Sequence, residues 1–163
     1  MLKKRVIPVL LLQGGGLVKT IKFDNPKYIG DPINAIRIFN QKEVDELIIL
    51  DISSSIQFKE PNYDLIKAVA GECFMPLTYG GGIRTIDQAK RIFDLGVEKI
   101  SIQSAAFDNI DFISALVKLF GSSSVVLSVD MKKTFFGGYK VFNFTKKNKN
   151  TRQLERLVKT ISE

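Results

Sequence analysis

The clearest fold signal in the sequence lies in residues 75–102, MPLTYGGGIRTIDQAKRIFDLGVEKISI. The stretch opens with an apolar run at 75–79 and closes with another at 99–102, and such runs are typical of strands buried on both faces. Between the runs, apolar residues recur at helical spacing at Ile86, Ala89, Ile92 and Phe93. The stretch therefore predicts a strand, a helix and a second strand parallel to the first.

Two local signals set the ends of this central helix. Thr85 and Gln88 have the spacing of a capping box, and Gly96 follows the last apolar turn. A second helix is expected to begin at Asn109 and to stop at Gly121.

The same alternation extends outward in both directions. Further apolar runs lie at 6–12, 47–51 and 125–130, and helical patterns lie around Ile36 and Ile66. Strands separated by single helices make parallel βα units, which leaves an open doubly wound sheet or a (β/α)₈ barrel. After 130 the rhythm breaks, and two alternating runs about a Gly-Gly pair predict a hairpin insertion at 132–144. A final helical pattern occupies 154–161. Together, the five apolar runs and the helical patterns that follow them predict about five βα units.

Composition excludes several function classes. The chain has 163 residues, no histidine and one cysteine, Cys73. Histidine triads, Cys-His dyads, histidine-bound metals and internal disulfides are therefore excluded, and we expect no metal and no cofactor. The run at 6–12 is too short for a membrane span, and a cytoplasmic protein with no membrane partner is expected.

The basic charge is confined to one end of the chain. The formal net charge is +7, and residues 132–163 carry nine basic and two acidic side chains. The remaining residues, 1–131, carry 15 of each sign. Nucleic acid is therefore not expected as a partner.

Candidate ligand-binding residues follow the apolar runs, because parallel α/β folds bind ligands at the carboxyl ends of their strands. Glycine triplets at 14–16 and 80–82 suit either an anion or a tight turn, and the second precedes a helix, which favours phosphate. Asp51 and Asp130 suit acid–base chemistry, or equally the capping of a loop. At the opposite ends of the strands, Arg5, Glu46 and Lys99 read on their own as ordinary charged strand starts.

These residues together resemble a known family, the cyclase subunit of imidazole glycerol phosphate synthase (the HisF family). The likeness is collinear and is carried by 1–7 (MLKKRVI), 30–32 (GDP), 45–47 (DEL), 50–52 (LDI), 80–83 (GGGI), 99–102 (KISI) and 121–122 (GS). The resemblance implies a (β/α)₈ TIM barrel of two half-barrels. Since such a barrel takes about 250 residues, residues 1–163 are expected to form one incomplete barrel domain.

The resemblance also assigns roles to individual residues. Asp130 matches one catalytic aspartate, whereas Leu11 stands where the family has the other. Lys19 and Asp51 match substrate-binding positions. Four further residues match a phosphate-binding site, with Gln103 and Ser104 as replacements for Asn and Thr: Gly81, Gly82, Gln103 and Ser104.

At the other end of the barrel, the resemblance implies an ammonia gate at Arg5, Glu46 and Lys99 and a partner interface at Glu98. The expected partners are a HisH-like glutaminase subunit, which supplies the ammonia, and a phosphorylated small-molecule ligand. The altered acid–base pair favours a divergent branch of the family, in which the ammonia goes to an N-acetyl sugar amidotransferase of polysaccharide biosynthesis. An ordinary cyclase of histidine biosynthesis and an inactive fragment or binding module are the alternatives.

Overall fold

The computed structural model describes residues 4–21, 24–54, 57, 59–133, 135 and 137–141. Along the chain its elements are β1 (Val9–Gln13), β2 (Gly16–Ile21), β3 (Asp24–Gly30), α1 (Pro32–Gln41), β4 (Leu47–Asp51), α2 (Tyr63–Glu72), β5 (Leu77–Gly80), α3 (Ile86–Asp94), β6 (Lys99–Ile102), α4 (Ser104–Asp108), α5 (Ile110–Phe120), the 3₁₀ turn η1 (Ser122–Ser124), β7 (Val125–Leu127), β8 (Met131–Lys133) and β9 (Tyr139–Val141).

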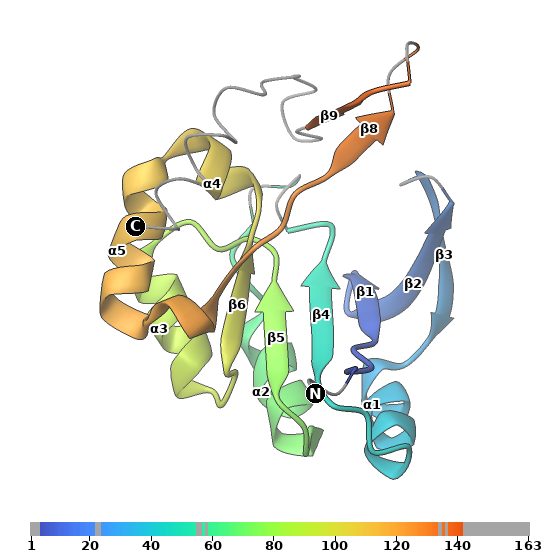
Figure 1. Cartoon of the computed structure of the whole chain (residues 1–163). Coiled ribbons are helices and arrows are strands. Elements are labelled where there is room, and N and C mark those ends of the chain that lie inside the picture. Colours follow the sequence, from blue (N-terminus) through green and yellow to red (C-terminus); the bar gives the residue numbers. More distant parts are fainter. Residues whose placement is uncertain are drawn as a thin grey trace.

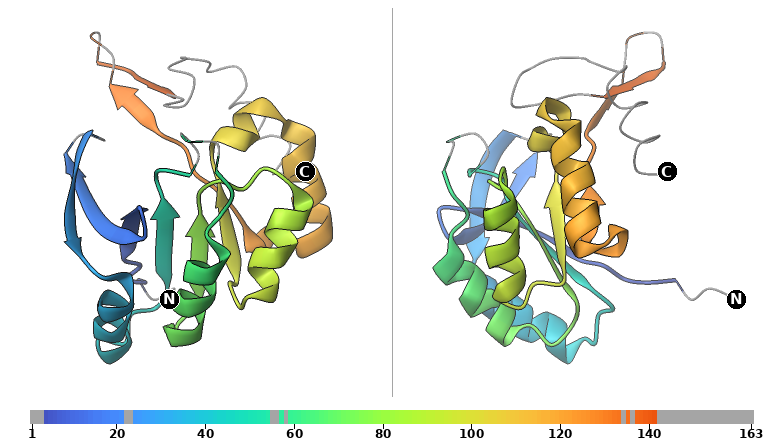
Figure 2. Two further views of the ribbon diagram at one scale, coloured as in Figure 1. Left: turned by 180° about the vertical axis from the view of Figure 1, so that it is seen from behind. Right: turned by 90° about the vertical axis from the view of Figure 1, so that its left-hand side faces the viewer.

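Seven strands form one sheet in the order β3-β2-β1-β4-β5-β6-β7. The neighbours from β1 to β7 are parallel, and β2 and β3 extend the sheet as an antiparallel meander. Helices α2, α3 and α5 cover one face (Figures 1 and 2). This is the expected α/β architecture, an incomplete barrel with five parallel strands in the part that the structure describes.

The hydrophobic core lies between that face and the helices. It takes alternate residues of each strand, because successive side chains of a strand point to opposite faces. The buried strand residues on the helix side are Leu47 and Ile49 of β4, Leu77 and Tyr79 of β5, and Ile100 and Ile102 of β6. The intervening residues, such as Thr78 and Ser101, therefore point to the opposite face, which in a closed barrel is the interior.

The expected helix ends are confirmed. Thr85 and Gln88 form the capping box of α3, and Asn109 caps α5 by accepting the N–H groups of Asp111 and Phe112. Gly121, which follows α5, has φ +88°, a value that suits glycine.

Of the two alternatives for Gly14-Gly15-Gly16, an anion site or a tight turn, the structure supports the turn. Gln13 pairs with Gly16 in a two-residue hairpin, and Gly14 and Gly15 both have positive φ, as a tight primed turn requires. The triplet is therefore a turn. The short helix α4 and strands β2 and β3 were not expected.

The hairpin expected at 132–144 overlaps the antiparallel pair β8–β9, in which Lys132 lies opposite Lys140. Figure 1 shows this pair beyond the carboxyl ends of the parallel strands. Residues 142–144 and the final helical pattern at 154–161 lie outside the described residues. None of the helices in the described ranges combines the length and the apolar character that a membrane crossing demands.

Candidate functional site

A pocket of about 280 Å³ lies at the carboxyl ends of β4, β5 and β6 and beside the residues that follow β7. It brings together most of the candidate residues from this end of the strands. The lining includes Leu11, Thr20, Leu50, Asp51, Gly81, Gly82, Gln103, Ser104, Ser128 and Asp130. Lys19 is exposed on β2 and does not line the pocket, although its neighbour Thr20 does.

Asp130 faces this pocket with a defined partner. The side-chain amide of Gln103 donates a hydrogen bond to its Oδ2 atom. Burial raises the pKa of Asp130, and the hydrogen bond from Gln103 partly opposes that rise. A half-buried carboxyl group with a raised pKa suits proton transfer. Leu11 lines the same pocket and can neither take nor give a proton.

Asp51 is held by its own loop. Its Oδ1 atom accepts hydrogen bonds from the backbone N–H and the hydroxyl of Ser53 at 2.9 and 2.8 Å, and from the N–H of Ser54 at 3.1 Å. Its Oδ2 atom accepts the Ser54 hydroxyl at 2.6 Å. The carboxylate therefore organises the loop after β4, and it also lines the pocket.

The second glycine triplet allows two loops to approach each other closely. A Cβ atom on Gly81, at φ +122°, would lie 2.4 Å from the carbonyl oxygen of Asp51. A Cβ atom on Gly82, at φ +74°, would lie 3.0 Å from the carbonyl oxygen of Lys59. Both glycines are required by the packing of the loops after β4 and β5, whether or not a ligand is bound.

A cluster of three charged side chains lies at the opposite ends of the strands, and we call it the charged cluster: Arg5, Glu46 and Lys99. Arg5 Nη1 pairs with Glu46 Oε1, and Lys99 Nζ lies 2.6 Å from Glu46 Oε2. The Glu46 carboxylate is buried, and its pKa is lowered, most strongly by the hydrogen bond from Lys99. Glu98 is exposed directly before Lys99.

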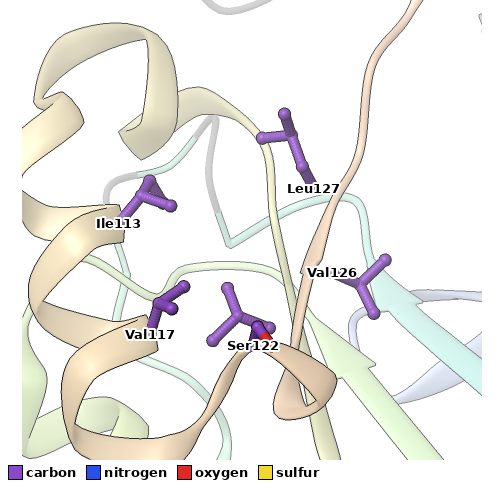
Figure 3. A pocket seen from close by; sticks show the side chains of 6 residues that line it. Ile113, Val117, Ser122, Val126 and Leu127 are labelled. Carbon is purple, nitrogen blue, oxygen red and sulfur yellow. The ribbon is translucent and has the colours of Figure 1, made fainter. Parts of the chain in front are cut away.

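A smaller pocket lies between α5 and β7 and has a different character. It is lined by apolar side chains and Ser122, and Figure 3 shows Ile113 and Val117 of α5 on one side of it. None of its lining residues is an acid or a base, and Ser122 has no general base beside it in the lining. Within the described ranges, no group of acidic or cysteine side chains is placed to hold a metal ion.

Sequence reasoning missed two features of the pocket. The contact between Gln103 and Asp130 joins residues 27 positions apart, and no local pattern signals it. Thr20 lines the pocket only because β2 folds back on β1. The Gly-Gly turn at the start of β2 is the signal that could have revealed that hairpin.

Comparison with known proteins agrees with this architecture. The family model of the histidine biosynthesis protein matches residues 5–163. A Pseudomonas aeruginosa protein, provisionally named imidazole glycerol phosphate synthase subunit hisF2, is 58% identical over 156 residues, which cover 96% of this chain and 61% of that protein. A Leptospira borgpetersenii protein, provisionally named subunit HisF of the same synthase, is 54% identical over 164 residues, which cover 100% of this chain and 65% of that protein.

A third relative is more distant. The imidazole glycerol phosphate synthase subunit HisF of Streptococcus sanguinis is 38% identical over 142 residues, covering 87% of this chain and 56% of that protein. The chain thus spans about three fifths of the length of these relatives. With the family model matching nearly the whole chain, the resemblance to HisF is confirmed, and the chain belongs to the histidine biosynthesis protein family.

Proposed function

We propose that the chain is the barrel portion of a glutamine-dependent synthase. A HisH-like glutaminase partner supplies ammonia at the charged cluster, and the barrel delivers it to a phosphorylated or sugar acceptor. The observation that carries this proposal is the contrast between the two ends of one sheet. In the charged cluster, Glu46 pairs with both Arg5 and Lys99. In the pocket, Leu11 lies with Asp130 in the lining, at the position where the resemblance implies a second acid–base group.

The face between the two ends suits a small polar molecule. Thr78 pairs with Lys99 in the sheet, and Ser101 lies two residues beyond Lys99 on the same face. Both residues are almost fully buried and carry hydroxyl groups. Ammonia can exchange hydrogen bonds with such groups along the way from the charged cluster to the pocket.

At the carboxyl end, we assign Asp130 as the proton-transfer residue and Asp51 as a substrate-binding residue. Lys19 does not line the pocket, and its substrate-binding assignment rests on the resemblance alone. Gly81, Gly82, Gln103 and Ser104 are assigned to a phosphate, on the support that all four line the pocket. With Leu11 in place of an aspartate, the cyclisation of the aminoimidazole ribonucleotide loses one of its two acid–base groups. Such a group is commonly worth about 10²–10⁴ in rate.

The comparisons support a branch distinct from the ordinary cyclases. The relatives with provisional names are 58% and 54% identical to this chain, against 38% for the Streptococcus sanguinis HisF subunit. An acceptor outside histidine biosynthesis, such as an N-acetyl sugar bound by a separate amidotransferase, is consistent with that division.

The test supplies the full chain with the aminoimidazole ribonucleotide substrate and an ammonium salt, and follows product formation. The Streptococcus sanguinis subunit serves as the active control. We expect no turnover by the wild-type chain and measurable turnover by Leu11→Asp. Turnover by the wild type at the rate of the control would refute the proposal.

That outcome would favour the second candidate, an ordinary cyclase. The observation that supports this candidate is that Asp130 lines the same pocket as the residues assigned to phosphate. Absence of turnover together with no complex with a glutaminase would leave the third alternative, an inactive fragment or binding module.

A further inference from the structure

Phe74 lies in the loop between α2 and β5 with 84% of its surface exposed. Of the large apolar side chains that the structure describes, only Phe135 is more exposed. Single exposed apolar residues are common on protein surfaces, so this exposure needs a second observation before it carries meaning.

The second observation is that the loop holding Phe74 is fixed from both sides. Asn40 of α1 accepts the backbone N–H of Phe74 at 3.2 Å and donates its own amide to the Glu72 carbonyl at 2.8 Å. The Glu72 carboxylate in turn pairs with Arg37 of α1 at 2.9 Å. The Cys73 thiol donates to the Met75 carbonyl at 3.3 Å. Because this backbone is already fixed, covering the ring costs little further backbone entropy.

The third observation is the position of this loop. It leads into β5, which lies between β4 and β6 in the sheet. Glu46 directly precedes β4, and Lys99 is the first residue of β6. The backbone N–H of Leu47 donates to the Pro76 carbonyl at 2.9 Å, and that of Glu98 donates to the Leu77 carbonyl at 3.0 Å. A partner seated over the charged cluster would therefore also cover the start of β5.

The carboxylate of Glu98, which lies beside the loop of Phe74, indicates which kind of side chain a partner would present there. Glu98 is exposed, and it lies near enough to Cys73 for its carboxylate to add to the effect of burial in raising the pKa of that thiol. The surface next to Phe74 thus combines an aromatic ring with a carboxylate.

We propose that Phe74 is the aromatic anchor of the glutaminase interface. This inference rests on the proposed function and adds to it the residue that supplies most of the binding energy on this side. The partner is expected to present an apolar pocket for the ring and a cationic side chain for Glu98. Buried aromatic side chains of this kind dominate the energetics of many interfaces.

The experiment measures the dissociation constant between the full chain and a purified HisH-type glutaminase subunit from the same organism by titration calorimetry. Phe74→Ser is compared with Phe135→Ser, the same substitution at the other highly exposed phenylalanine of the described residues. Phe135 lies in sequence between β8 and β9, and Figure 1 shows these two strands beyond the opposite ends of the parallel strands. We expect Phe74→Ser to raise the dissociation constant about 30-fold and Phe135→Ser to leave it within about twofold.

Each outcome has a distinct meaning. Tight binding by the wild type and equally tight binding by Phe74→Ser would overturn the anchor and leave the proposed function standing. No binding by the wild type would refute the proposed function and the anchor with it. Sedimentation of the chain alone tests whether a second copy of this chain covers the ring instead. Self-association that Phe74→Ser abolishes, while glutaminase binding stays unchanged, would assign the ring to that second copy. Unchanged thermal unfolding of both variants serves as the folding control.

Discussion

Replacing Glu46 by glutamine keeps the shape of the side chain and removes the charge that Arg5 and Lys99 share. The Glu46 side chain is 9% exposed, whereas Lys99 is 27% and Arg5 is 62% exposed. The substitution therefore leaves one largely buried ammonium group without its counter-charge, and one guanidinium group that already lies mostly in water.

The cost follows from these exposures. Removing one member of a buried ion pair costs about 3–5 kcal/mol, because the other charge stays buried and unpaired. Lys99 has a long stem and some exposure, so its ammonium group can move toward water and recover part of that cost. Arg5 contributes at most about 1 kcal/mol, as an exposed pair does. We therefore expect Glu46→Gln to lower the free energy of unfolding by about 2–3 kcal/mol, or about 4–12 °C in melting temperature.

The effect depends on pH with a definite sign. The pKa of Glu46 in the folded chain lies below its ordinary value of 4.5, so the folded state favours the charged form. Its stabilising contribution is fully present above pH 4.5 and is lost as the pH falls through the lowered pKa. The difference between wild type and Glu46→Gln should therefore be constant from about pH 6 to 8 and shrink in acid.

Urea denaturation followed by circular dichroism at several pH values measures these differences. A double-mutant cycle with Lys99→Met isolates the contact, and we expect a coupling energy of about 1–3 kcal/mol. Arg5→Met is the matched control, with a small effect. A Glu46→Gln variant as stable as the wild type at every pH, or an Arg5→Met variant that costs as much, would refute the argument that Lys99 and burial make this pair strong.

Two further predictions concern the carboxyl end of the sheet. Because burial raises the pKa of Asp130 in the folded chain, the charged form is disfavoured at neutral pH, and Asp130→Asn should raise the melting temperature by about 1–2 °C at pH 7. This gain should vanish below the ordinary pKa of 3.8, and a gain that persists there would contradict the assignment. Gly81→Ala combines a positive φ with a Cβ atom 2.4 Å from the Asp51 carbonyl, and should cost about 2–4 kcal/mol in urea unfolding. The control Gly14→Ala also has positive φ but meets no atom within 4 Å, so a cost equal to that of Gly81→Ala would show that packing plays no part.

The parallel part of the fold was predictable because its signals are local. A capping box at Thr85, a cap at Asn109 and a glycine at position 121 each act within a few residues, and the helices they bound lie where they were expected. Buried parallel strands are also easy to recognise, since both of their faces are apolar. The meander of β2 and β3 was missed because β3 is mostly polar and exposed, as an antiparallel strand at a sheet edge can be.

The site was predictable as a set of positions but not as a set of contacts. Parallel strands bring their carboxyl ends to one edge, so Asp51, Gln103 and Asp130 had to lie near one another. Which side chains pair depends on distances between loops from different βα units. The sequence therefore left two sets of contacts undecided. Asp51 accepts four hydrogen bonds from its own loop, and the Gln103 amide donates a hydrogen bond to Asp130.

The free-energy cost of burying the charged cluster is evidence about its role. A buried ion pair is weak evidence for a stabilising role, because well-packed apolar residues of similar volume are often as stable or more so. Ile48 of β4, two residues after Glu46, is apolar, so an aliphatic side chain is compatible with the start of this strand. Stability alone therefore gives no reason for three charges around a buried carboxylate. The proposed role in admitting ammonia does give a reason, and the proposed glutaminase interface would then cover the charged cluster and the exposed ring of Phe74 together.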